Sequence, residues 1–158
     1  MNKPEVVLVF GRICSGKSTF QSQQYRIIVS NIVRDIINSS DRSALQNTMH
    51  LDERIAEEVV SCLDALTTAI KYKLIPFRNI VVDGIRQSSI VDYVLQWYPD
   101  AELVWLEVPE HKRKERYELR NADKDTESFE EADNKPIELE CQKIFSIFEE
   151  KLQIINNH

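Results

Sequence analysis

The chain has 158 residues, of which 42% are hydrophobic and 29% are charged, a balance typical of one compact soluble domain. A net charge of −6 argues against binding nucleic acid or an anionic membrane through bulk charge, although a local basic groove is compatible with it. The sequence has no apolar run near the ~18 residues of a spanning helix and no signal-peptide pattern, so no membrane partner is expected. Three widely spaced cysteines (Cys14, Cys62, Cys141) indicate neither a disulfide framework nor a metal knuckle, which favours a reducing, cytoplasmic location.

Uninterrupted apolar runs predict buried strands of the kind found in parallel sheets. These runs span residues 5–10, 26–29, 79–83, 102–108 and 151–155. Apolar residues spaced by three or four predict helices between them. The helical segments span residues 32–37, 51–74, 87–97, 110–120 and 136–148. Strands alternating with helices in this order indicate a single α/β domain over residues 1–158, with a parallel sheet and helices on both faces.

Individual residues add detail to the predicted helices and to one acidic stretch. A short helix ending near residues 20–24 is expected directly after the first turn, and Ser30 or Asn31 is expected to cap the next helix. Pro136 fits the first position of the last helix, because its missing N–H is not needed there. The acidic stretch before it, up to residue 134, has only a weak apolar pattern.

The chain contains three glycines, where a protein of this length has about eleven at ordinary usage. Gly11 and Gly16 follow the first predicted strand, and Gly84 follows the third. Because other turns are built without glycine, these three are expected at positions where no Cβ fits.

The segment after the first strand matches the pattern GxxxxGK[ST] without a break. It reads Gly11-Arg12-Ile13-Cys14-Ser15-Gly16-Lys17-Ser18 and is followed by Thr19. In this pattern backbone N–H groups point into one concavity that binds phosphate, and the following helix adds its positive end. Lys17 is predicted to contact the β- and γ-phosphates of a nucleotide, and the Ser18 hydroxyl to ligate Mg²⁺. The alternative is a chance glycine turn with a surface lysine, which explains neither the strand before it nor the spacing.

Polar residues follow the second and third strands at the edge where a parallel sheet binds ligands. Asp83 ends the third strand and is predicted to orient Mg²⁺ or to hold an acceptor group, the alternative being an aspartate that starts a turn. Arg34 and Arg86 lie just past these two strands and are predicted to form a fork for an acceptor phosphate. The alternative for both is a solvated surface arginine.

Three arginines recur on the charged helix at Arg113, Arg116 and Arg120, and this spacing places them on one face. We interpret the face as a lid that brings positive charge to a transferring phosphoryl group, above all through Arg116 and Arg120. The alternative is a solvated helix face. Asp133 and Glu138 are predicted to hold the lid arginines in place.

These residues resemble the nucleoside-monophosphate-kinase-like group of P-loop kinases, which includes adenylate, thymidylate and dephospho-coenzyme A kinases. The phosphate loop of the group resembles Gly11 to Ser18, and its acceptor strand with the following arginine resembles residues 28–34. Its DG-x-x-R motif resembles Asp83-Gly84-Ile85-Arg86. Its lid signature resembles Glu115-Arg116-Tyr117 with Arg120. The resemblance implies a three-layer sandwich with a five-stranded parallel sheet of order 2-3-1-4-5, MgATP as the donor, and a short lid at about 110–134. The Pro often found before Arg86 is missing, and residues 37–74 match no specificity motif of the group.

Within this group the opening Phe10 to Thr19 is similar to phage kinases that act on 5-hydroxymethyluracil in DNA, a step toward hypermodified thymine. The resemblance implies a hydroxymethyl acceptor and the host cytoplasm as the location. A carboxylate would then take the hydroxyl proton, and Asp83 is better placed for this than Asp35. Two alternatives remain at this stage: a kinase of free nucleoside monophosphates, and a nucleotide switch without an acceptor.

Overall fold

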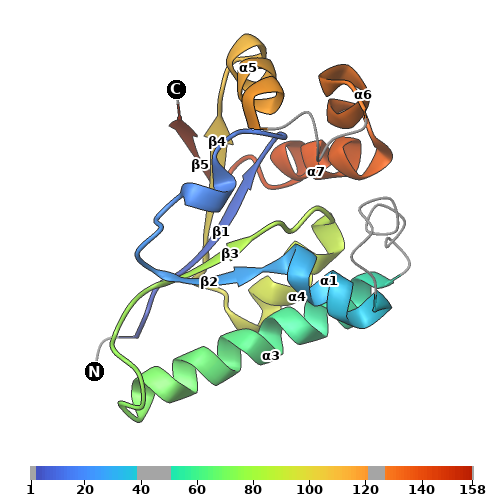
Figure 1. The fold of residues 1–158 in the computed structure, drawn as a ribbon. Coiled ribbons are helices and arrows are strands. Elements are labelled where there is room, and N and C mark those ends of the chain that lie inside the picture. Colours follow the sequence, from blue (N-terminus) through green and yellow to red (C-terminus); the bar gives the residue numbers. More distant parts are fainter. Residues whose placement is uncertain (1–2, 39–50, 121–126, 158) are drawn as a thin grey trace.

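A computed structural model describes residues 3–38, 51–120 and 127–157 of the chain. Its centre is a parallel sheet of five strands in the order β2-β3-β1-β4-β5 (Figure 1). The strands are β1 (Val6–Gly11), β2 (Tyr25–Ile28), β3 (Ile80–Asp83), β4 (Glu102–Glu107) and β5 (Leu152–Asn156). Each lies within a residue or two of the run that predicted it, and the order 2-3-1-4-5 is confirmed.

Helices connect the strands and pack on the sheet. They are η1 (Lys17–Thr19), α1 (Val29–Ile37), α3 (Asp52–Lys71), α4 (Ser88–Trp97), α5 (Glu110–Arg120), α6 (Phe129–Asp133) and α7 (Pro136–Ile147). Within the described residues, none of these helices combines the length and the apolar character that crossing a membrane requires.

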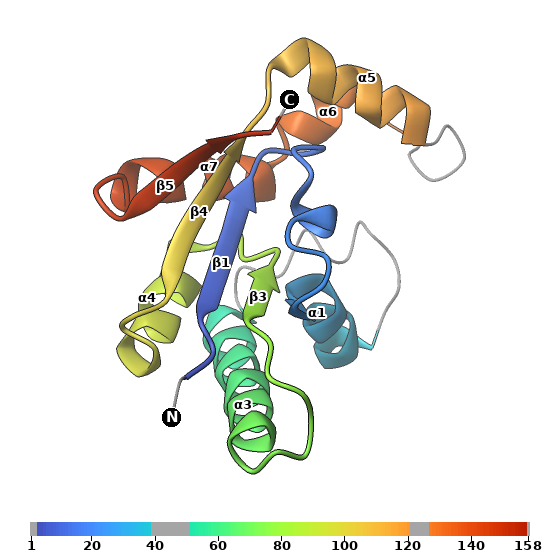
Figure 2. The same ribbon diagram turned by 90° about the vertical axis from the view of Figure 1, so that its left-hand side faces the viewer.

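The two faces of the sheet are covered unequally. On one face α1, α3, α4 and α7 pack against the larger hydrophobic cluster, and Figure 2 shows α3, α4 and α7 together behind the sheet. On the other face a smaller cluster around Val9 and Val104 packs against Phe20, next to the short helix η1. Helices thus lie on both faces, as predicted, but the second face is covered by one turn of 3-10 helix and its neighbours.

The short helix expected to end near residues 20–24 is present only as the single 3-10 turn η1, which ends earlier, at Thr19. The chain leaves η1 at Phe20 with an extended backbone, and Gln21 has a left-handed φ of 47°. Arg26 on β2 donates hydrogen bonds to the carbonyl oxygens of Lys17 and Phe20, the former at 3.0 Å. In a longer helix these carbonyl oxygens would accept hydrogen bonds from the N–H groups of the next turn. Here they accept hydrogen bonds from the arginine side chain instead.

The helix α1 begins three residues earlier than predicted, at Val29 instead of Ile32. Strand β2 runs directly into α1, and Ile28 takes the N-cap position without a side-chain hydrogen bond. Ser30 and Asn31 therefore lie inside the first turn instead of capping it. The helix α3 ends at Lys71, so Leu74 is not part of its apolar face and is 76% exposed.

The parallel register brings the important turns to one edge of the sheet. Val9 pairs with Asp83, and Ile28 pairs with Asp83 from the other side. Because all five strands run the same way, the phosphate-loop pattern, the start of α1 and the turn after β3 emerge together at their carboxyl ends. The helices α5, α6 and α7 lie beyond this same edge (Figure 1).

Candidate active site

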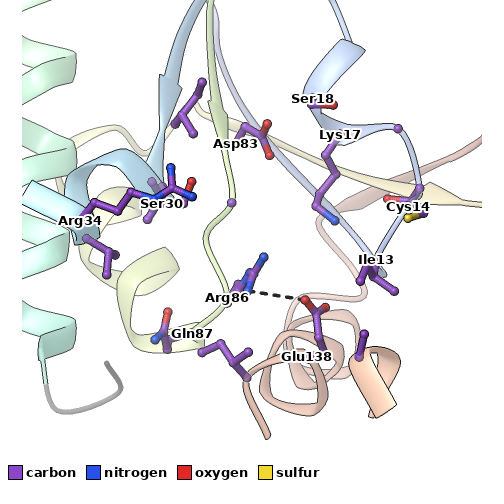
Figure 3. A pocket seen from close by; sticks show the side chains of 18 of the residues that line it. Ile13, Cys14, Lys17, Ser18, Ser30, Arg34, Asp83, Arg86, Gln87 and Glu138 are labelled. Carbon is purple, nitrogen blue, oxygen red and sulfur yellow. Dashed lines mark ion pairs between the residues drawn. The ribbon is translucent and has the colours of Figure 1, made fainter. Parts of the chain in front are cut away.

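A pocket of about 350 Å³ opens at the carboxyl edge of the sheet. The phosphate loop (residues 11–19) forms one wall, and the segments that follow β2 and β3 form another. The first turn of α7 closes a third side. Most of the predicted site residues line this pocket, namely Cys14, Ser15, Gly16, Lys17, Ser18, Arg34, Asp83, Arg86 and Arg120. Figure 3 shows the side chains of Lys17, Asp83, Arg86 and Glu138 around the same open space.

The phosphate loop adopts a backbone that its glycines allow. Gly16 has a φ of 93°, in the region that side chains avoid, and the side chain of Asn157 lies where a Cβ would point. A Cβ on Gly11 would collide with the Ser15 hydroxyl and come within 3.0 Å of the Leu106 carbonyl oxygen. The expectation that no Cβ fits is confirmed for Gly11 and Gly16. A Cβ on Gly84 would meet only ordinary contacts, the nearest being the Val29 Cβ at 3.6 Å, and it is the φ of 101° that favours glycine there.

Two buried polar atoms in the loop point to a missing partner. Among the described residues, the Ser15 hydroxyl oxygen and the Arg12 Nε have no hydrogen-bond partner, and Ser15 is 1% exposed. A buried polar group without a partner costs free energy, and the Ser15 hydroxyl, which lines the pocket, would gain a partner from a bound anion or its water.

Lys17 lies at the centre of the site. Its Nζ donates to the carbonyl oxygens of Gly11 at 2.7 Å and Arg12 at 3.1 Å, so the ammonium group is held inside the loop. Burial lowers the pKa of Lys17, while the negative charges of Glu138 and Asp83 oppose this by favouring the ammonium form. The lysine is therefore a desolvated donor whose charge anionic oxygens would stabilise.

Asp83 is 8% exposed at the end of β3. Burial raises the pKa of this carboxyl group, and the charges of Lys17, Arg26 and Arg86 oppose the rise. No group of three or more His, Cys, Asp or Glu side chains in the described ranges could hold a metal by itself. The exposed Ser18 hydroxyl and the Asp83 carboxylate are too few ligands for Mg²⁺ by themselves. They suit an ion that is also bound by phosphate oxygens, which is the usual way proteins bind Mg²⁺.

The two arginines predicted to bind an acceptor both line the pocket and come from different elements. Arg34 on α1 donates to the Oδ1 of Asn31 at 3.1 Å. Arg86 forms an ion pair with Glu138, with 3.5 Å between Nη1 and Oε1 (Figure 3). Glu138 was predicted to hold a lid arginine, and this was wrong. The first turn of α7 packs beside the turn after β3 and directs its carboxylate toward Arg86.

The predicted lid helix α5 contacts the phosphate loop through its arginines. Arg113 is buried and pairs with Asp133 at 2.8 Å, as predicted for this carboxylate. Arg116 donates to the carbonyl oxygens of Cys14 at 3.2 Å and of Asn157 at 3.1 Å. Arg120 lies over the Tyr117 ring, 5.0 Å from its centroid, and lines the pocket. The part of the predicted lid at residues 121–126 lies outside the described residues.

Three contacts at the site were not predicted. Asp133 also pairs with Arg12, at 2.6 Å, and so joins the phosphate loop to α5 and α6. The Asn157 side chain donates to the Ser15 carbonyl oxygen at 2.9 Å. Arg26 holds η1, as described above. The side chains of Asp133, Asn157 and Arg26 belong to no motif, and those of Asp133 and Asn157 contact loop residues 121 and 142 positions away in the sequence.

The comparisons with known proteins agree with this geometry. A chain in the structure of the Pnkp1/Rnl/Hen1 RNA repair complex matches with a TM-score of 0.62 and 18% identity, over 100% of this chain and 50% of that one. This chain therefore spans half the length of that neighbour. Shikimate kinase from Bacteroides thetaiotaomicron matches with a TM-score of 0.52 and 14% identity, over 97% of this chain and 86% of the kinase.

At the level of sequence, no curated protein matches the chain. A family model described as an AAA domain (AAA_18) matches residues 7–136, which is most of the chain. The matched segment begins in β1 and contains the phosphate loop, Asp83 and the three arginines of α5. The chain therefore belongs to the AAA domain family AAA_18, with the P-loop kinase fold, which implies ATP binding.

Proposed function

We propose that the protein transfers the γ-phosphoryl group of MgATP to a hydroxyl group on a nucleotide-type acceptor, namely the hydroxymethyl group of 5-hydroxymethyluracil in DNA. One observation carries the proposal: a single pocket has the phosphate loop with Lys17 on one side and Asp83, Arg34 and Arg86 on the other. A donor and an acceptor bound in its two halves would meet beside Lys17 and Asp83.

The donor half binds the triphosphate through the backbone amides of the loop. Lys17 exchanges its carbonyl partners for the β- and γ-phosphate oxygens, which also restores the charge that burial disfavours. Mg²⁺, held by Ser18 and the phosphates and oriented by Asp83 through a water molecule, would neutralise part of the phosphate charge. Arg116 and Arg120 add positive charge from α5 to the oxygens of the transferring group.

The acceptor half positions the hydroxyl group and removes its proton. As the acceptor oxygen forms its bond to the γ-phosphorus, the bridging bond to the β-phosphate oxygen breaks and ADP leaves. The hydroxyl proton passes to a carboxylate oxygen of Asp83, whose raised pKa makes it a stronger base than an exposed aspartate. Asp35 is exposed and does not line the pocket, so it is not proposed for this step.

A DNA acceptor requires its base to leave the helix stack, at a cost of a few kcal/mol. The basic residues of α5 would hold the DNA backbone near the pocket despite the negative net charge of the chain. A free nucleoside monophosphate is the second candidate acceptor, favoured by the presence of both Arg34 and Arg86 in the pocket. A nucleotide switch would not need this second half of the pocket.

The test uses γ-labelled ATP, Mg²⁺ and three acceptors: an oligonucleotide with 5-hydroxymethyluracil, the same oligonucleotide with thymine, and thymidine 5′-monophosphate. The proposal predicts label on the first acceptor and none on the other two. Label on the monophosphate alone would replace the acceptor assignment. ATP binding with no transfer to any of them would refute the proposed function.

A further inference from the structure

The acceptor half of the pocket contains a carboxylate for which phosphoryl transfer itself provides no role. Glu138 lies in the first turn of α7, and its side chain is 9% exposed. Its Oε1 is 3.5 Å from the Nη1 of Arg86, and both residues line the pocket. An acid in a first helical turn is favoured by the helix dipole, but this effect operates equally well at the surface. A carboxylate that is buried and directed at a pocket arginine needs a further explanation.

The charges of the acceptor half balance. We define this half by Ser30, Arg34, Asp83, Arg86 and Glu138. It has two guanidinium groups and two carboxylates, so it offers no excess positive charge to an entering ligand. Of the other charged residues that line the pocket, Lys17 donates to carbonyl oxygens of the phosphate loop, Arg120 lies over Tyr117 on α5, and Glu127 pairs with Lys135 at 2.6 Å. Lys17 is also close enough to Glu138 for this carboxylate to favour its ammonium form.

Resting on the function proposed above, we propose that Glu138 determines the charge of the acceptor that this enzyme uses. By pairing with Arg86 it neutralises one arm of the fork that would bind a phosphate. It also places a negative charge beside any dianionic phosphate in this half of the pocket, and such like-charge contacts disfavour the wrong partner. A neutral hydroxyl group meets no such repulsion and hydrogen-bonds to the charged pair. The acceptor half is therefore selective for an uncharged reacting group over a phosphate monoester.

The experiment compares Glu138→Gln with the wild type, with Glu140→Gln as a matched control. Glu140 is on the same helix and forms an ion pair with exposed Lys143 at 2.9 Å. The donor half is first filled with Mg²⁺ and a non-hydrolysable ATP analogue. Calorimetry then measures the dissociation constants of two probes, thymidine 5′-monophosphate and 5-hydroxymethyl-2′-deoxyuridine.

We expect Glu138→Gln to tighten binding of the monophosphate by at least ~10-fold, because the repulsion is removed and Arg86 is released. Binding of the hydroxymethyl nucleoside should change by less than ~3-fold, and Glu140→Gln should leave both constants unchanged. Adding Arg86→Gln to Glu138→Gln should remove the gain for the monophosphate. If Glu138 had only a structural role, Glu138→Gln would weaken the binding of both probes together.

Two results would overturn the inference: a monophosphate affinity that Glu138→Gln leaves unchanged, or a shift of both probes by the same factor. Because binding is measured without turnover, these results are distinct from failure of the proposed function. That failure would appear as absence of label transfer by the wild type to the 5-hydroxymethyluracil oligonucleotide.

Discussion

Replacing Asp133 with asparagine removes a negative charge that lies between two guanidinium groups. The carboxylate is 4% exposed, 2.8 Å from the Nη1 of Arg113 and 2.6 Å from the Nη2 of Arg12. Asparagine keeps the shape but has a single acceptor oxygen and no charge. Arg113, itself 3% exposed, would then be a buried cation without its counter-charge.

Removing one partner of a buried ion pair costs about 3–5 kcal/mol. Arg113 would keep its hydrogen bonds to the carbonyl oxygens of Val108 at 3.3 Å and Ile13 at 3.4 Å, and its position over the Phe129 ring at 5.2 Å. These contacts offset part of the loss, so we expect the lower end of the range, about 3 kcal/mol. Domains of this kind have a total free energy of unfolding of about 5–15 kcal/mol, so the change should be large.

Urea denaturation followed by circular dichroism measures this change, and hydrogen exchange locates it. The urea midpoint should fall, and amides of α5 and α6 should exchange faster in Asp133→Asn, because these helices are joined to the loop through this carboxylate. Glu130→Gln is the matched control on α6, since Glu130 pairs with exposed Lys114, and it should leave the midpoint unchanged. An unchanged midpoint together with wild-type exchange in α5 and α6 would refute the reasoning.

Three further predictions concern the pocket. Lys17→Ala should lower turnover by at least ~10²-fold in the labelled-ATP assay, comparable to the loss of one strong transition-state donor, and near-wild-type turnover would contradict its assignment. Asp83→Asn should abolish transfer and raise the melting temperature at neutral pH, because the raised pKa of Asp83 means that its ionised form destabilises the fold. The difference in melting temperature between Asp83→Asn and the wild type should shrink as the pH falls through the raised pKa, because the wild-type carboxyl group then becomes neutral. Scanning fluorimetry across pH measures this difference, and a difference that grows toward low pH would contradict the prediction. Gly16→Ala should destabilise the fold by about 1–3 kcal/mol and weaken ATP binding, because Gly16 has a φ of 93°, and calorimetric titration with ATP would check the second effect.

The sequence predicted those features that depend on neighbours in the chain. Strands such as β1 and β3 are continuous apolar runs, and their burial on both faces requires that pattern. The phosphate loop was predicted because the spacing of Gly11, Gly16, Lys17 and Ser18 is a pattern within eight consecutive residues. The helix α5 begins at the predicted residue, Glu110, directly after Pro109.

The features that were missed depend on contacts between different elements. The turn after η1 reads as helical, and the sequence does not show that Arg26 on the next strand takes the carbonyl oxygens that a continuing helix would use. Glu138 was expected near α5, and the packing of α7 determines that it meets Arg86 instead. Asn157 carries no motif, yet its side chain lies against Gly16 and binds the Ser15 carbonyl oxygen.

These distant contacts have a common consequence for the chemistry of the pocket. Arg26 holds the carbonyl end of η1, Asn157 holds the Ser15 carbonyl, and Asp133 joins Arg12 to the predicted lid. The loop thus keeps its shape through side-chain hydrogen bonds from three other elements, where a long helix after the loop would otherwise supply rigidity. Preorganised amides stabilise phosphate charge only if they need not rearrange during transfer. The short helix η1 is therefore compatible with a working phosphate loop as long as these three contacts remain.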